Sequence, residues 1–247
     1  MAGRADTDAT EPSGAEPAGA IEPDGATGRE ISAAAASLLA RWWTRPVLAE
    51  VESWIGMADL EAEVARQVSG SSAAETPALP YRMDDVPELL DEFERLFVGP
   101  GPVPCPPYES YWREDVPIDL WHSLMGPCVG DLLRLYRDLG IEFDPAAGEL
   151  PDHVAVEFEA LLVALSIADG DDAGAVRAEV GERVAKALLV EHLNVWLPRL
   201  CRAVIKESRH PFYTELAARS LIWLGQIQDA VDAHEAASDR LVAPFAR

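Results

Sequence analysis

The sequence has few cysteines, and their placement narrows what the protein can be. Its three cysteines, Cys105, Cys128 and Cys201, are odd in number and far apart. This pattern is typical neither of a disulfide framework nor of a Cys-x-x-Cys metal or redox pair. We therefore expect small buried side chains in a protein of a reducing compartment.

Long hydrophobic runs are missing as well. No stretch of the sequence approaches the roughly 18 consecutive apolar residues of a membrane-spanning helix. The first residues are acidic rather than basic, and no apolar segment follows them as in a signal peptide. We therefore expect neither a signal peptide nor stable insertion into a membrane.

Positive charge is scarce. Lys and Arg number 20 against 43 Asp and Glu, the formal net charge is -23, and the only lysines are Lys186 and Lys206. Such a surface repels the phosphates of nucleic acids and anionic lipids, so we expect no nucleic acid partner. It suits a basic peptide. Adaptation to a salty cytosol, or the bias of a high-GC coding sequence, explains the acidity equally well.

Motifs of enzyme chemistry are also missing. The sequence contains no GxxxxGK[ST] loop, no dinucleotide-binding fingerprint and no GxSxG elbow. His153 and Glu157 lie one helical turn apart, but no third ligand stands at a recognisable spacing. We predict a protein that is not an enzyme, without catalytic residues, metal or cofactor. A helical hydrolase or nucleotide-binding enzyme, the first rival, needs a nucleophile, base or phosphate cradle that no motif supplies.

The hydrophobic spacing predicts an all-α protein. We expect a single-domain helical bundle of about ten helices over residues 31–247, after a disordered acidic tail at 1–30 that lacks aromatic residues. Pro46, Pro198 and Pro211 are expected helix boundaries, and Pro127 is expected to kink a helix. The predicted helical segments are 31–43, 47–55, 60–68, 85–97, 120–139, 154–165, 176–196, 197–205 and 212–227.

Two details of this pattern concern the segment around residue 100. Asp85 and Glu88 have the spacing of a capping box at the start of a helix. The run Gly99–Pro107 (GPGPVPCPP) cannot form regular structure, because proline lacks an amide donor and fixes its backbone angle. It predicts a stiff loop.

Three segments combine proline, aromatic and polar residues. They are LFVGP at 96–100 with PPYESYW at 106–112, ELPDH at 149–153, and EHLNVW at 191–196 with HPFY at 210–213. A proline-stiffened loop offers rigid apolar area to a peptide at low entropic cost, and nearby carboxylates suit guanidinium groups.

Packing is an alternative explanation of the same residues. Helical aromatic spacing usually means a core, so we expect Trp196, Phe212 and Tyr213 to be buried and His192 and His210 to be structural. We expect Tyr108 and Trp112 to be partly exposed. Asp152 is as compatible with capping a helix as with binding a ligand.

In these segments the sequence resembles the TorD/DmsD/NarJ family of redox-enzyme maturation chaperones, most closely its TorD/DmsD branch. The patterns LFxGP…PPYESxY, E-x-PDH and HLxxW…HPFY occur in order, and the resemblance covers about residues 31 to 235. It implies a cytoplasmic chaperone, monomeric or a domain-exchanged dimer. Its partner would be the catalytic subunit of a molybdenum oxidoreductase of the DMSO-reductase superfamily, through the twin-arginine leader or the apo-form. The chaperone would assist insertion of the molybdopterin cofactor and delay export.

Two further alternatives stay open: a NarJ-like assembly chaperone for a client without a cleaved leader, and a structural subunit of a larger complex. The peptide-binding residues predicted from the resemblance and the chemistry are Leu96, Phe97, Pro107, Tyr108, Glu109, Trp112, Glu149, Asp152 and His153.

Overall fold

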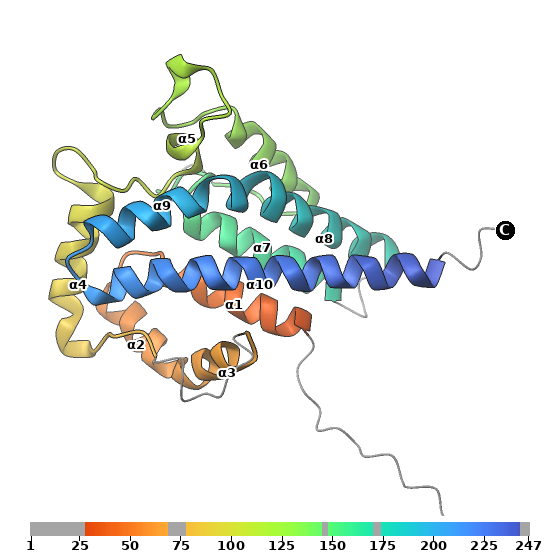
Figure 1. Cartoon of the computed structure of the whole chain (residues 1–247), viewed down its shortest axis with the longest axis horizontal. Helices are drawn as coiled ribbons and strands as arrows, with labels where there is room; N and C mark the ends of the chain where they lie inside the picture. The colour runs from red at the N-terminus through yellow and green to blue at the C-terminus, as the bar shows by residue number, and fades with distance from the viewer. Residues whose placement is uncertain (1–27, 69–77, 145–147, 170–173, 243–247) are drawn as a thin grey trace, which may run out of the picture.

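The chain folds into a bundle of α-helices (Figure 1). The computed structural model describes residues 28–68, 78–144, 148–169 and 174–242, with side chains up to residue 237. Most of the predicted disordered tail, residues 1–27, lies outside the described residues. Helix α1 begins at Gly28, three residues before the predicted boundary.

The amino-terminal part of the bundle confirms the predicted helical spacing. Pro46 separates α1 from α2, as expected. After α4 the chain widens into one π-helical turn, called η2 here, before the proline-rich loop. The bounds are α1 (Gly28–Trp42), α2 (Leu48–Gly56), α3 (Ala58–Val68), α4 (Val86–Phe93) and η2 (Glu94–Val98).

The remaining helices follow a short α5, which is a single turn. No β-strand is present in the described ranges, where the only pairing of this kind is an isolated bridge between Tyr108 and His153. The expectation of an all-helical bundle of about ten helices is therefore confirmed. The bounds are α5 (Glu109–Trp112), α6 (Cys128–Asp138), α7 (Val154–Asp169), α8 (Ala175–Ala187), the π-helical turn η4 (Leu188–Leu193), α9 (Asn194–Glu207) and α10 (Pro211–Val242).

Close helix packing forms the body of the molecule. Helix α1 lies against α7 and α10, α7 against α8, and α9 against α10. At Gly181 of α8, a Cβ atom would stand only 2.7 Å from both the carbonyl oxygen of Ala164 and the amide nitrogen of Ala168. A larger residue would therefore force α7 and α8 apart.

Seven aromatic side chains pack against one another, and we call them the aromatic core. Phe212 stacks on Trp54 with ring centroids 5.5 Å apart, and Phe97 meets Tyr213 edge to face at 5.6 Å. The expected burial of Phe212 and Tyr213 is confirmed. The aromatic core consists of Trp43, Trp54, Tyr81, Phe93, Phe97, Phe212 and Tyr213.

Three local predictions are wrong. The segment before Pro127 is a loop with one 3-10 turn (Ile118–Leu120), and α6 begins only at Cys128, because the proline ring fits at a helix start. Pro198 lies inside α9 rather than at its boundary. The Asp85 side chain makes no capping hydrogen bond at α4, so no capping box forms.

Candidate functional site

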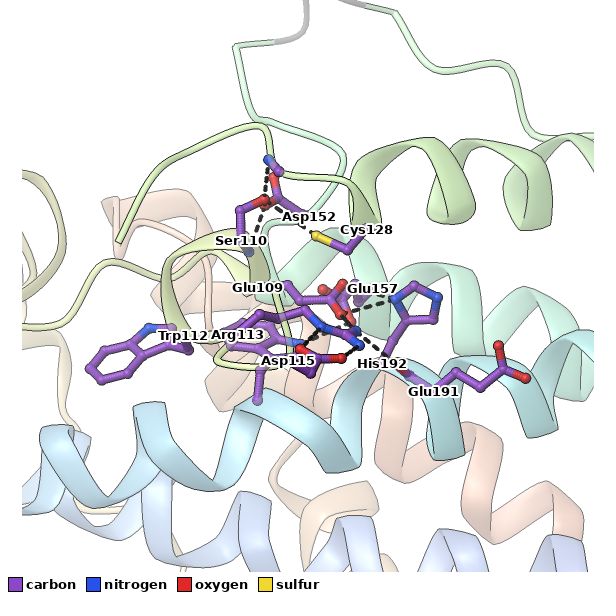
Figure 2. Close-up of polar contacts among 12 residues, drawn as sticks. Glu109, Ser110, Trp112, Arg113, Asp115, Cys128, Asp152, Glu157, Glu191 and His192 are labelled. Atoms are coloured by element: carbon purple, nitrogen blue, oxygen red, sulfur yellow. Dashed lines mark hydrogen bonds and ion pairs between the residues drawn. The ribbon is translucent and has the colours of Figure 1, made fainter. Parts of the chain in front are cut away.

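The three segments singled out in the sequence meet next to α5. Backbone hydrogen bonds join the first two: the amide of Glu109 donates to the carbonyl of Asp152 at 2.9 Å, and that of Val154 donates to Pro107 at 3.0 Å. The third segment enters from the η4 turn. Figure 2 shows the side chains that gather there. We call them the polar junction: Glu109, Ser110, Arg113, Cys128, Asp152, Glu157 and His192.

Asp152 connects the first two segments through its side chain. Its Oδ2 accepts a hydrogen bond from the backbone amide of Ser110 at 3.0 Å and a second, short one from the Ser110 hydroxyl. Asp152 is fully buried, and desolvation raises the pKa of its carboxyl above the ordinary value. It therefore bridges two segments, rather than only capping its own helix.

Glu109 connects α5 to the third segment. Its carboxylate accepts from Nη1 of Arg113 at 2.5 Å, and Nδ1 of His192 lies 2.9 Å from Oε2. Arg113 also donates to the backbone carbonyl of Glu191 at 2.8 Å, so its guanidinium spans α5 and η4 (Figure 2). Hydrogen bonds to Asp115 and Glu109 raise the pKa of Arg113. His192 is buried, in line with its expected structural role.

Glu157 is the third buried carboxyl of the polar junction. Its Oε2 accepts from the indole nitrogen of Trp196 at 3.2 Å, while Oε1 has no hydrogen-bond partner among the described residues. Burial, followed by the nearby charge of Glu109, raises its pKa well above the ordinary value. Burial therefore favours the neutral, protonated form of Glu157.

The chemistry of the polar junction is that of a structural cluster. Its three carboxyl groups are fully buried, and burial raises the pKa of the Cys128 thiol to about 12, so no reactive thiolate forms at neutral pH. Across the described part of the chain, no three His, Cys, Asp or Glu side chains are placed so that they could hold a metal ion together. The polar junction fixes the positions of three chain segments relative to one another.

Most of the predicted peptide-binding residues are buried. Leu96 and Phe97 lie in the interior on η2, Phe97 within the aromatic core. Glu109 and Asp152 belong to the polar junction. The remaining buried members of the predicted set are Pro107 and His153.

Three of the predicted residues reach the surface. Tyr108 and Trp112 are half-buried, as expected, and Glu149 is exposed. The Tyr108 hydroxyl donates to Oε2 of Glu149 at 3.4 Å, and its ring lies edge to face against His153. Burial lowers the pKa of His153 to about 4. That imidazole is therefore neutral at neutral pH and accepts from the amide of Ala155 through Nδ1.

Glu149 also borders a groove of about 720 Å³ between α1 and α7. The groove is walled by apolar side chains, among them Val47, Leu162 and Val163, and it carries the carboxylates of Glu50, Glu149 and Glu159. Burial raises the pKa of Glu149 and of Glu159. Arg41 and Arg45 also line the groove, and Arg45 is paired with Glu94 at 2.6 Å.

Several of these residues were missed by the sequence analysis. Arg113 stands four residues after Glu109, the spacing of an ion pair on one helical face, so this signal was present. Glu50 and Glu159 carry no local signal, because their shared groove exists only once α1, α2 and α7 pack together.

No helix of the described residues is both long enough and apolar enough to cross a lipid bilayer.

Comparison with known proteins gives consistent results. Residues 59–202 match the family described as nitrate reductase delta subunit, which is more than half of the chain. The Tat proofreading chaperone DmsD of Salmonella typhi is 29% identical over 178 residues, 72% of this chain and 74% of the relative. The Tat proofreading chaperone DmsD of Salmonella typhimurium is 27% identical over 177 residues, with the same two shares.

One solved structure is also similar. It is described as a redox enzyme maturation protein from Archaeoglobus fulgidus, with 20% sequence identity, a TM-score of 0.49, and coverage of 82% of this chain and 96% of that chain.

Proposed function

The chain belongs to the nitrate reductase delta subunit family, and from this we propose that it is a cytoplasmic chaperone for one molybdenum oxidoreductase. It binds the twin-arginine leader of the catalytic subunit, its apo-form, or both. By holding the unfinished subunit, it assists insertion of the molybdopterin cofactor and delays export. The similarity to Tat proofreading chaperones supports this role.

The observation that carries the proposal is the groove beside Glu149 and Tyr108. Its carboxylates and apolar walls suit a peptide that joins arginine residues to an apolar stretch, because guanidinium groups pair with carboxylates and aliphatic side chains bury against Leu162 and Val163. Burial raises the pKa of Glu149, and a cationic ligand would favour its charged form. The net charge of -23 draws in basic segments.

The polar junction has a supporting part in this proposal. It holds the backbone of residues 107–110 against residues 152–154, and thereby sets Tyr108 against His153 and Glu149. The buried members of the predicted set, Asp152 and His153 among them, would then act on the peptide by positioning Tyr108 rather than by contact. A rigid binding surface lowers the entropic cost of capturing a peptide.

A second candidate function is assembly of a client without a cleaved leader, as in the NarJ branch. The description of the matching family as nitrate reductase delta subunit favours it. In that case the groove would take a basic and apolar segment of the mature subunit.

The test is calorimetric titration with synthetic twin-arginine leaders of the molybdenum oxidoreductases encoded in the same genome. We expect saturable binding of one leader at moderate salt. Glu149→Gln should weaken it about tenfold, since a charge-assisted hydrogen bond contributes about 1.5 kcal/mol. High salt should reduce this difference.

Glu142→Gln is the matched control, because Glu142 is exposed and does not line the groove. It should bind the leader like the wild type. If no leader binds and the apo-subunit does, the second candidate function replaces the first. Equal leader affinities of wild type and Glu149→Gln would place the leader elsewhere on the surface.

A further inference from the structure

The loop between α5 and α6 displays an unusual amount of apolar surface. It projects from the body of the bundle at the top of Figure 1. Four of its large side chains are exposed: Ile118 by 77%, Trp121 by 40%, Leu124 by 50% and Met125 by 55%. We call residues 116–126 the apolar loop. Large exposed apolar side chains that lie this close in the sequence are typical of an interaction site.

Hydrogen bonds hold the apolar loop in its projecting shape. At its end, the Ser110 hydroxyl accepts from the amide of Gly126 at 2.8 Å. Within it, the indole nitrogen of Trp121 donates to the carbonyl of Val116 at 3.1 Å, and the His122 ring packs on Tyr111. Its apolar side chains are therefore presented by a braced backbone.

Two residues of the loop adopt a backbone conformation that side chains disfavour. His122 and Met125 both have φ of 58°, in the left-handed region. For Met125 this geometry is uncommon, and it persists only where the surroundings impose it. The hydrogen bond at Gly126 fixes the backbone next to Met125, and the Met125 side chain is exposed there.

The charges around the apolar loop indicate a partner that carries basic groups. Glu114, Asp115 and Asp119 are exposed acidic residues in and beside it. Arg199 pairs with Glu114, and Arg113 is shared between Asp115 and the buried Glu109, so the sum of these charges remains negative. A partner segment must therefore offer apolar side chains for the loop and basic groups for its rim.

The same charges disfavour two other occupants. A second copy of the chain would bring a further net charge of -23 against an acidic rim. An anionic lipid surface would be repelled in the same way. A basic and apolar peptide meets neither obstacle.

We propose that the apolar loop binds the apolar segment of the partner's leader, the stretch that follows its arginine residues. This inference rests on the proposed function and adds a second surface to it. The groove beside Glu149 takes the arginine residues and the first apolar side chains that follow them, and Ile118, Trp121 and Leu124 take the later part of the apolar segment.

The test compares two double variants of the full chain in calorimetric titration with the leader that binds the wild type. Ile118→Ser/Leu124→Ser removes two exposed apolar side chains from the loop. Val176→Ser/Ile222→Ser is the control, since these residues on α8 and α10 are exposed by 77% and 56%. We expect the loop variant to bind about tenfold more weakly and the control variant to bind within twofold of wild type.

A second peptide, with its apolar segment replaced by serine and its arginines kept, separates the two surfaces. It should bind the wild type and the loop variant equally, and it should still respond to Glu149→Gln. A loop variant that binds the intact leader within twofold of wild type overturns the inference and leaves the proposed function standing. Absence of leader binding by the wild type overturns both.

Two further outcomes count against the inference. If the loop variant keeps its leader affinity but no longer binds the apo-subunit, the loop belongs to recognition of the mature body. If sedimentation shows a wild-type dimer that the loop variant lacks, with leader affinity unchanged, the occupant is a second copy of this chain.

Discussion

The aromatic core and the polar junction are built from neighbouring parts of the same sequence segments, yet they are held together in opposite ways. In the aromatic core, the Phe97 ring packs against Phe93 and the Phe212 ring against Tyr213. Glu109 and Asp152 are equally buried but are held by hydrogen bonds and ion pairs. Each region contains one π-helical turn, η2 in the first and η4 in the second.

The difference shows that the aromatic core provides stability, whereas the polar junction sets the positions of the chain segments. Burial of aromatic side chains is favourable at any pH and requires only shape. Buried carboxyl groups lose hydration, so they contribute little net stability and are destabilising when a partner is removed. Their value is that the hydrogen bonds of Asp152 and Glu109 define one arrangement of three segments.

The largest expected effect is in the aromatic core. Phe212→Ala should lower the free energy of unfolding by about 3 to 5 kcal/mol, because it leaves a cavity between Trp54, Tyr81 and Tyr213. Urea denaturation at pH 6 and pH 8 should give the same loss at both values. Phe212→Leu should lose less, since it refills part of the cavity. A loss that depends strongly on pH would contradict the division between the two regions.

The next largest effect is a pH dependence of stability that the polar junction should show and the aromatic core should not. The folded-state pKa of Glu157 is raised from the ordinary 4.5 by burial, so above pH 4.5 the folded protein binds more protons than the unfolded chain. Stability therefore falls as pH rises from 4.5 toward the folded-state pKa. In Glu157→Gln this dependence should be shallower, as measured by urea denaturation between pH 6.5 and pH 8.5.

The measurement starts at pH 6.5 because His153 affects stability in the opposite direction below that pH. Its pKa is lowered from 6.5 to about 4 by burial, so its contribution has the opposite sign. That contribution is present above pH 6.5 and is lost as pH falls from 6.5 to about 4. Above pH 6.5 the contribution of His153 no longer changes with pH. Identical slopes for wild type and Glu157→Gln there would show that Glu157 is ionised in the folded protein.

The smallest expected effect lies at the outer edge of the polar junction. Tyr108→Phe removes one long hydrogen bond to the exposed Glu149 and should change the free energy of unfolding by less than about 0.5 kcal/mol. Thermal denaturation measures this change. A larger loss would place Tyr108 among the residues that stabilise the fold, rather than among those that the fold positions.

The sequence was sufficient for the helices and insufficient for the loops around them. Apolar spacing located α1, α7 and the first half of α10 because each buries a continuous stripe. The predicted end of the last helix at residue 227 is wrong, since α10 continues to Val242. The sequence pattern also failed at Pro127 and Pro198, since a proline can start a helix or lie within one, and the choice depends on tertiary packing. The apolar loop was partly assigned to a helix for the same reason.

The candidate site was predicted less well than the fold. Leu96 and Phe97 have the composition expected of a peptide-binding surface, but the same composition is expected of a core, and only packing decides between them. The groove between α1 and α7 joins Glu50 to Glu159 across more than a hundred residues, a contact that no local pattern encodes. The binding role of the predicted residues stays a prediction.

The π-helical turn η4 has a consequence for how this sequence can change. A wide turn corresponds to one extra residue in a helix, and π turns often occur at functional positions. Deleting one residue from Leu188–Leu193 would restore a regular helical turn and leave α8 and α9 near their present register, but it would change the direction of the side chains within the turn. His192 would then leave Glu109, while α9 would keep its face toward α10. A single-residue deletion here should therefore leave the packing of α9 on α10 in place and disturb the polar junction, as a substitution of His192 would.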